Sequence, residues 1–304
     1  MSNPLQIAII GTGNIGSTFA YQLALAGGHA VTVIARPDSP RLRQLQRDGA
    51  IVRDDGTRAP VTVADRLDTA TPYDLVIVTV PAQQVDTLIP VLRDSAAARI
   101  LFMINQFDPE RLRDAIGPAR CDFGMPFVQA SLDADGRLHA VIGAGGQKSK
   151  LSAQLWADVF NAGGLPAVLE PDMLRWLRCH APLCVAFEAV SVAGVRRGGG
   201  ASWGEAAALA RGVQACFALI VSSGDQLYPA GKRRLHASPF WVTAVILWSI
   251  SRIPSFRMLL AQGQNECRAL AGAMAAAAQQ AGRFNDVKKI TAMQPPGTVD
   301  AQRT

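Results

Sequence analysis

Apolar runs and helical patterns alternate along the first half of the sequence. Continuous apolar runs predict strands at residues 5–10, 30–34, 74–79 and 100–104, and the segments between them predict helices at 15–27, 42–48 and 83–93. Strands that are apolar on both faces and alternate with helices are typical of a parallel, doubly wound sheet. Segments 120–123 and 138–142 are expected to close or extend this sheet, with short β segments around 51 and 61.

The second half changes to an all-helical pattern at about residue 173. A Gly-rich link at 143–150 and a helix at 151–161 come before it. A long helix is expected over 174–195, and a second runs from Ser202, which forms a capping box with Glu205, to about 223. Two or three more occupy 239–280. We therefore expect a Rossmann domain over 1–165 and a helical domain over 166–290, as in folds like 6-phosphogluconate dehydrogenase, with a loose tail at 291–304.

Composition narrows the class of protein. Hydrophobic residues make up 49% and charged residues 18% of 304, which indicates a globular chain. The net charge of +6 is spread without a basic stripe, so nucleic acid is not an expected partner. Five cysteines without a CxxC pair or a histidine at ligand spacing indicate reduced thiols and no metal site. No signal-like leader precedes the first strand, and the apolar run 239–250 is shorter than a membrane span. We expect a cytoplasmic protein in which 239–250 is a buried helix.

The first turn carries a nucleotide-binding motif. A GxGxxG pattern follows the first strand and opens the first helix, which is the context that dinucleotide binding requires. The glycines allow a tight turn, close approach of a pyrophosphate, and close packing of helix on strand, while the helix N-terminus faces the phosphates. The alternative is a plain tight turn. The assigned residues are Gly11, Thr12, Gly13, Asn14, Ile15 and Gly16.

The end of the second strand bears on the choice between NAD and NADP. An acidic residue there usually holds the ribose 2′-hydroxyl of NAD, but this strand ends at Arg36, with Arg41 and Arg43 close behind. A guanidinium can pair with the 2′-phosphate of NADP, which a carboxylate would repel. NADP(H) is therefore the expected cofactor. Solvated arginines with Asp38 on the ribose are the alternative.

Several segments together resemble the ketopantoate reductase family over most of the chain. They are IAIIGTGNIG, GHAVTVIAR followed by RLRQLQRDGAIV, YDLVIVTVPAQQV, the pair Ile104-Asn105, and a helix with Glu266 and Gly272. The resemblance implies that the N-terminal domain binds NADPH and that a helical domain closes over a 2-keto acid, with a lysine helping to protonate the product. It also implies that Asn105 touches the nicotinamide side of the cofactor and that Glu266 binds a substrate hydroxyl or helps orient the cofactor. Val80 and Pro81, after the third strand, are assigned to the cofactor site.

The chain departs from the family at several positions. Pro81 stands where the family usually has lysine. Aligned on Trp176, the family's Lys-Asn-Asn face at steps of four becomes Arg178, Pro182 and Ala186. Ketopantoate itself is therefore not the expected substrate.

Two residues could take over the role of the family lysine, which helps to protonate the product. Arg178 could stabilise an alkoxide or clamp a carboxylate, and His180 could donate a proton. They lie ~200° apart on a regular helix, unless Pro182 kinks it. The alternatives are an ordinary ion pair for Arg178, a structural histidine for His180, a solvated charge for Glu266 and a strand-end turn for Asn105. Glu188, inside the apolar run VAFEAV, has no assigned role.

Three functions remain open. The first is an NADPH-dependent oxidoreductase that reduces the ketone of a small 2-keto acid or related carbonyl compound. The second is an NAD(P)-dependent hydroxy- or amino-acid dehydrogenase, and the third is an NADP(H)-binding sensor without turnover. The apolar segment 240–250 indicates either an enclosed core or a subunit interface, and we expect a homodimer.

Overall fold

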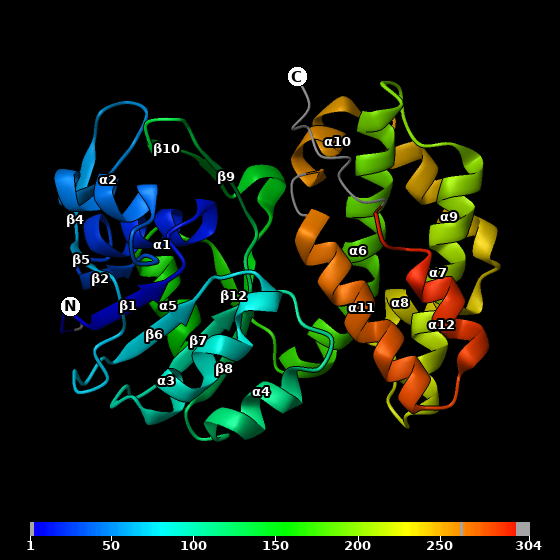
Figure 1. The fold of residues 1–304 in the computed structure, drawn as a ribbon, viewed down its shortest axis with the longest axis horizontal. Coiled ribbons are helices and arrows are strands. Elements are labelled where there is room, and N and C mark those ends of the chain that lie inside the picture. Colours follow the sequence, from blue (N-terminus) through cyan, green and yellow to red (C-terminus); the bar gives the residue numbers. More distant parts are fainter. Residues whose placement is uncertain (1–2, 262–263, 296–304) are drawn as a thin grey trace. The chain divides into compact units, whose positions relative to one another are not determined.

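The computed structural model describes residues 3–261 and 264–295 and divides into two compact units. Unit 1 contains Met1–Ile104 and Asp108–Leu174, and unit 2 contains Asn105–Phe107 and Arg175–Thr304. Unit 1 is the α/β part of the chain and unit 2 the helical part, so the predicted fold class is confirmed (Figure 1).

Unit 1 is built on an eight-stranded sheet with the order β12-β11-β8-β7-β6-β1-β2-β5. The neighbouring strands are parallel except for the pair β11–β8. The sheet grows away from β1 in both directions, through β2 on one side and β6 on the other. This reversal is the switch point at which doubly wound folds bind ligands. The strands are β1 (Gln6–Ile10), β2 (Ala30–Ile34), β3 (Ala50–Val52), β4 (Arg58–Pro60), β5 (Thr62–Ala64), β6 (Leu75–Val78), β7 (Ile100–Met103), β8 (Cys121–Met125), β9 (Val128–Leu132), β10 (Leu138–Ile142), β11 (Ser149–Leu151) and β12 (Ala167–Leu169).

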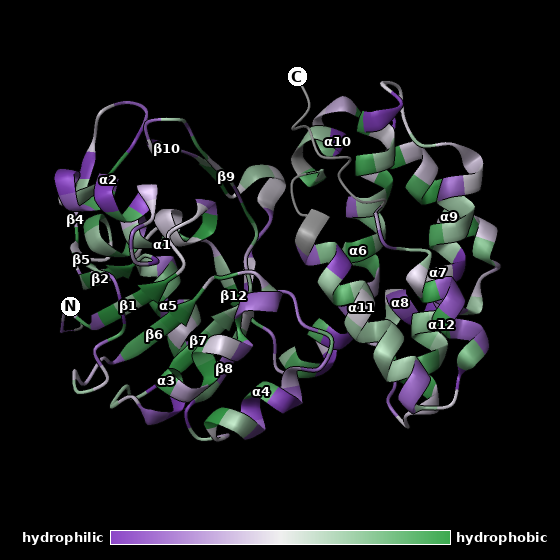
Figure 2. Ribbon diagram, viewed as in Figure 1, coloured by the Kyte–Doolittle hydropathy of each residue, from purple (hydrophilic) through white to green (hydrophobic). Residues whose placement is uncertain are grey.

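The central strands β1, β6 and β7 are apolar along their length (Figure 2), and both of their faces are buried. On one face, Phe19 of α1 meets Phe160 of α5 edge to face at 5.0 Å between ring centroids. On the other, Phe102 stacks on Phe123. The helices of this unit are α1 (Asn14–Leu25), α2 (Pro40–Asp48), α3 (Ile89–Asp94), α4 (Pro109–Ile116) and α5 (Gln154–Ala162), with 3-10 turns η1 (Ala82–Gln84), η2 (Asp86–Leu88) and η3 (Ala144–Gly146).

Two predicted elements of unit 1 were wrong in detail. Segment 138–142 does not extend the main sheet: β10 pairs antiparallel with β9 in a separate two-stranded sheet. Its residues alternate in burial, which suits a strand with one solvated face. The helix predicted at 83–93 is two 3-10 turns followed by α3. Pro90, which lacks an N–H, fits only the first turn of a helix, so α3 begins at Ile89.

Unit 2 is helical, as predicted. The capping box of Ser202 and Glu205 is present at the start of α7, and α6 runs without a break through Pro182. Helices α8 and α12 were not predicted. The helices are α6 (Met173–Arg196), α7 (Trp203–Ser222), α8 (Ala230–Ala237), α9 (Phe240–Ile250), α10 (Pro254–Leu260), α11 (Gln264–Gln280) and α12 (Phe284–Thr291).

The boundaries of the two units differ from those expected. Unit 1 continues past residue 165 to Leu174, because β12 pairs with β11 at the edge of the sheet. Of the expected tail at 291–304, residues 296–304 lie outside the described residues.

Three helices of unit 2 are strongly apolar. Helices α6 and α7 have the length and composition of membrane spans, but 61% of the apolar window of each is buried inside the protein. Helix α9, predicted to be buried, is only partly so: Ala244 and Leu247 are buried, whereas Trp241 is 53% and Val245 43% exposed.

Candidate functional site

The glycine turn of unit 1 lies at the carboxyl end of β1, at the switch point of the sheet. Gly11 has φ +100°, a conformation that favours glycine. A Cβ on Gly16 would lie 1.9 Å from the carbonyl oxygen of Gly11, so helix and turn pack too closely for any side chain. A Cβ on Gly13 would meet nothing within 4 Å. The turn is therefore closed at Gly11 and Gly16 and open at Gly13, as the approach of a pyrophosphate requires.

Residues after β6 support this turn from the neighbouring strand. The Thr79 hydroxyl donates to the carbonyl oxygen of Gly11 at 2.7 Å. Val80 is buried, and its Cγ1 lies 3.0 Å from where a Cβ of Gly11 would stand. Pro81 is exposed and precedes the first 3-10 turn. The predicted residues Val80 and Pro81 thus follow the strand that flanks the turn, and Thr79 is a contact that the sequence analysis missed.

The start of α1 leaves positive backbone charge at the turn. Gly13 caps the helix without a side-chain hydrogen bond, and its first turn holds no acidic residue. Asn14 is occupied elsewhere, because its Oδ1 accepts a hydrogen bond from Leu132 N at 3.1 Å. Ile15 is half-buried and packs against the core of unit 1. Unpaired N–H groups at a helix start favour an anionic ligand.

The three arginines after β2 have different surroundings. Arg36 is exposed at the strand end, and its guanidinium forms no hydrogen bond or ion pair with any described residue. Arg43 is exposed and donates to the carbonyl oxygen of Asp38 at 2.7 Å. Arg41 is half-buried, and burial lowers the pKa of its guanidinium. Only Arg36 therefore has its whole guanidinium available for a ligand.

Arg41 binds the glycine turn itself. Its Nε donates to the carbonyl oxygen of Thr12 at 3.1 Å, and its Nη2 donates to the Ser17 hydroxyl at 2.8 Å. Its Nη1 donates to the carbonyl oxygen of Gly136, in the turn between β9 and β10, at 2.8 Å. Arg41 is thus a structural support of the turn, a role that the sequence did not indicate.

In unit 2, the predicted catalytic residues Arg178 and His180 lie near the start of α6. Arg178 forms an ion pair with Asp225. The His180 ring stacks on Trp176 with 4.4 Å between centroids. The ammonium of Lys232, a buried residue, lies 4.8 Å from the centroid of the same indole and donates to the carbonyl oxygen of Trp176. Both candidates are therefore held by neighbours, and Lys232 is a charged group that the sequence analysis missed.

The predicted residues Asn105 and Glu266 meet in unit 2. Burial raises the pKa of Glu266, and hydrogen bonds from the side chain and main chain of Asn105 work against that rise. Cys184 of α6 also hydrogen-bonds to the Asn105 side chain. The Asn105 Oδ1 is itself buried without a hydrogen-bond partner among the described residues.

Glu188 of α6 lies beside this group. The Cys267 thiol contacts its Oε2, and Cys267 is the residue after Glu266 on α11. Burial, together with the charge of Glu266, raises the pKa of Glu188 to about 7. The sequence signalled Glu188 only as a charge in an apolar run, and nothing in the pattern indicated its contact with Cys267. We call Asn105, Cys184, Glu188, Glu266 and Cys267 the acidic cluster.

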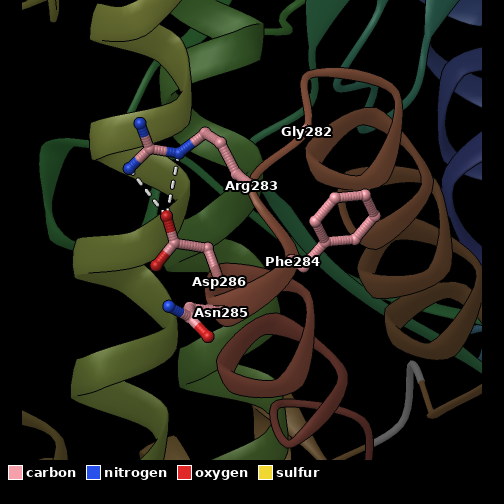
Figure 3. Close-up of a pocket in the computed structure, with 5 residues that line it drawn as sticks. All are labelled: Gly282, Arg283, Phe284, Asn285 and Asp286. Carbon is pink, nitrogen blue, oxygen red and sulfur yellow. Dashed lines mark hydrogen bonds and ion pairs between the residues drawn. The ribbon is translucent and has the colours of Figure 1, made fainter.

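A surface depression of about 380 Å³ lies elsewhere in unit 2, at the turn between α11 and α12 (Figure 3). It is lined by residues 282–286, of which Arg283 and Asp286 form an ion pair. It contains none of the predicted site residues. No group of His, Cys, Asp and Glu within residues 3–261 and 264–295 is arranged to hold a metal ion.

Comparisons with known structures agree with the fold. The structure is similar to D-mandelate dehydrogenase in complex with NADH, with 16% identity, 95% of this chain and 97% of that chain covered, and a TM-score of 0.69. It is also similar to a PanE/ApbA family ketopantoate reductase from Ralstonia eutropha JMP134, with 18% identity, 94% and 96% covered, and a TM-score of 0.71.

A third similar structure is the 2-dehydropantoate 2-reductase from Porphyromonas gingivalis W83, with 15% identity, 95% and 98% covered, and a TM-score of 0.66. At such identities the likeness shows the fold alone. A search of curated proteins found no match to the sequence. Residues 7–151 match the sequence model of the ketopantoate reductase PanE/ApbA family. The N-terminal part of the chain therefore contains a domain of the ketopantoate reductase PanE/ApbA type.

Proposed function

We propose that this protein is an NADPH-dependent reductase of a small 2-keto acid or a related carbonyl compound. The match of residues 7–151 to the ketopantoate reductase family model supports an oxidoreductase that acts on a ketone or the corresponding alcohol with a nicotinamide dinucleotide. The observation that carries the choice of NADPH is Arg36, whose guanidinium is exposed and uncommitted at the end of β2, beside the open glycine turn. A charge-assisted hydrogen bond from Arg36 to the 2′-phosphate would distinguish NADPH from NADH.

The residues of unit 1 fit a dinucleotide at the carboxyl edge of the sheet. The open side of Gly13 and the N-terminus of α1 suit the pyrophosphate, and Val80 and Pro81 border the neighbouring strand end. The bound nicotinamide supplies the hydride for reduction. Arg41 supports the conformation of the turn, because each of its three nitrogens already donates to a protein oxygen.

The substrate class rests on the family and on one structural neighbour. D-mandelate dehydrogenase was solved with NADH and anilino(oxo)acetate. The lost Lys-Asn-Asn pattern argues against ketopantoate itself. Arg178 is paired with Asp225, so a substrate carboxylate would have to compete with that ion pair.

The test measures affinity for NADPH and NADH together with turnover of a panel of 2-keto acids. Arg36→Ala is expected to weaken NADPH binding by about 10- to 100-fold and leave NADH binding nearly unchanged, since a hydrogen bond to a charged group contributes about 1.5–3 kcal/mol. Arg47→Ala, which removes an exposed positive charge at the other end of α2, is the matched control. Equal loss for both cofactors would remove Arg36 from the site. NADPH binding without turnover of any carbonyl compound would favour the alternative that the protein is an NADP(H)-binding sensor.

A further inference from the structure

The carbonyl group of Thr12, in the middle of the glycine turn, is held from inside the protein. Its oxygen accepts two hydrogen bonds, one from Arg41 Nε at 3.1 Å and one from the Ser17 hydroxyl at 3.0 Å. Arg41 Nη2 donates in turn to the Ser17 hydroxyl at 2.8 Å, so the three residues form a closed triangle of hydrogen bonds. Ser17 is completely buried, and Thr12 is buried as well. Two buried side-chain groups therefore fix the direction of this carbonyl group.

The same peptide group ends in the N–H of Gly13. A peptide is planar and normally trans, so its C=O and its N–H point in opposite directions. With the oxygen turned toward Arg41 and Ser17, the N–H points away from them, and it forms no hydrogen bond with any described residue. A Cβ on Gly13 would meet nothing within 4 Å, so the space around this glycine is open. Gly13 thus offers a free backbone donor where the motif receives a pyrophosphate.

The guanidinium of Arg41 also brings a positive charge to the back of the turn. All three of its nitrogens donate to uncharged oxygens, which belong to Thr12, Ser17 and Gly136. Within the described part of the chain, no carboxylate forms an ion pair with it. A hydrogen bond from a cation polarises the carbonyl group and so strengthens the N–H of the same peptide as a donor. The charge and the geometry of Arg41 therefore favour the same ligand.

We propose that Arg41 and Ser17 are positioning residues for the pyrophosphate, which hold the Thr12–Gly13 peptide with its N–H toward the dinucleotide. This role deepens the proposed function and rests on it, because it requires the glycine turn to be the dinucleotide site. It differs from the role proposed for Arg36, which distinguishes the two cofactors through the 2′-phosphate. Loss of Arg41 weakens NADPH and NADH equally, whereas loss of Arg36 weakens NADPH alone.

Arg41 also connects the turn to a distant segment. Its Nη1 donates to the carbonyl oxygen of Gly136, between β9 and β10, and a Cβ on Gly136 would lie 2.7 Å from this Nη1. Gly136→Ala therefore displaces the guanidinium without changing a residue of the glycine turn. Gly56 has a similar φ, +82° against +77°, and nothing within 4 Å of its Cβ position. Gly56→Ala adds a similar backbone strain without a collision, so it is the matched control.

The test measures affinity for NADPH, NADH and adenosine 2′-monophosphate, which carries the 2′-phosphate but no pyrophosphate. Arg41→Gln should weaken both dinucleotides by about 10- to 100-fold, the range for a lost hydrogen bond to a charged group. Ser17→Ala should weaken them by about 2- to 10-fold, because Arg41 still holds the carbonyl group. Arg41→Lys keeps the charge without the planar fork and should resemble Arg41→Gln. Affinity for adenosine 2′-monophosphate should be unchanged in each variant, which also checks that the variant is folded.

Two further measurements do not depend on the Arg41 substitutions alone. Gly136→Ala should weaken both dinucleotides, and Gly56→Ala should weaken neither. In nuclear magnetic resonance spectra, the Gly13 amide proton of the wild type should shift downfield when NADPH binds, as a new hydrogen bond to the pyrophosphate requires. That shift should be lost in Arg41→Gln even when the cofactor is saturating.

The outcomes separate the positioning role from the proposed function. Wild-type affinity for the dinucleotides in Arg41→Lys would show that charge alone suffices and would overturn the positioning role. An equal loss for all three ligands, or an unchanged Gly13 shift in Arg41→Gln, would overturn it as well. A wild type that binds neither dinucleotide would overturn the proposed function and this role with it.

Discussion

At the scale of single residues, buried charges carry the information about function. Glu188 has an environment that raises its pKa from 4.5 to about 7. The same pKa shift makes the free energy of unfolding depend on pH. The folded protein binds more protons than the unfolded chain between these two values, so its free energy of unfolding falls as pH rises from 4.5 to 7 and then levels off.

This linkage predicts the effect of Glu188→Gln on stability. Near pH 5 the variant and the wild type should be similarly stable, because Glu188 is protonated and uncharged in the folded wild type. At pH 8 the wild type bears the cost of a buried carboxylate, which is about 3.5 kcal/mol at most, since one pKa unit corresponds to about 1.4 kcal/mol. Urea unfolding at the two pH values measures the difference. A gain in stability that is the same at both would contradict the raised pKa.

For single residues, the sequence predicted what depends on neighbouring positions in the chain, but not contacts with distant segments. The apolar run around Glu188 signalled an unusual charge. Its partner Cys267 lies 79 residues away and on another helix, so only the packing of α6 against α11 could reveal the contact. Arg41 illustrates the same limit: it stands among three arginines after one strand, but its bond to Gly136 crosses 95 residues.

At the scale of elements, the glycine turn has one position that should affect mainly cofactor binding and another that should affect mainly folding. Gly13→Ala adds a methyl group in open space at an ordinary φ of −75°. It should change stability by less than about 0.5 kcal/mol, as for most surface substitutions. The same methyl group stands where the pyrophosphate has to approach the backbone, so affinity for NADPH and NADH should fall together. Thermal unfolding and cofactor titration of one protein sample measure both effects.

Gly16→Ala is the paired variant, and its main effect should be on stability rather than on cofactor binding. Its Cβ would overlap the carbonyl oxygen of Gly11, which is backbone and cannot move aside without opening the turn. We expect a loss of stability of several kcal/mol, within the range for overpacking in a well-packed interior. Cofactor affinity falls as a consequence. If Gly16→Ala unfolds at the wild-type temperature, the close packing of α1 on β1 is not as described.

Elements with strong, local signals were predicted and those fixed by their neighbours were not. The strands β1, β2, β6 and β7 follow from continuous apolar runs, and the capping box of α7 follows from Ser202 with Glu205. Strands β11 and β12, which are only three residues long, were not predicted. β10 has the composition of a strand, but its partner β9 decides which sheet it joins. The helix expected over 83–93 begins only at Ile89, because the segment before it is divided into 3-10 turns.

At the scale of the whole molecule, the two units differ in how directly their sequences point to chemistry. Unit 1 carries a motif in which each glycine has a geometric reason, so the fold and the cofactor class could be predicted before the structure. Unit 2 offers helices whose amphipathic pattern does not say which faces meet. The alignment on Trp176 selected Arg178, Pro182 and Ala186, whereas Cys184 and Glu188 are the α6 residues that contact Asn105 and Cys267.

The apolar face of α9 leads to a prediction about assembly. Trp241 and Val245, one helical turn apart, are 53% and 43% exposed, and Ile246 is 40% exposed. Large exposed apolar groups on one helix are typical of a surface that binds another protein, and we expect a second copy of this chain to cover them. Sedimentation should show a dimer for the wild type and a monomer for a variant with Trp241→Asp and Ile246→Asp. Phe284→Asp removes an exposed apolar side chain from α12 and should leave the dimer intact, so a wild type that is monomeric at all concentrations, or a dimer lost equally in both variants, would contradict an interface at α9.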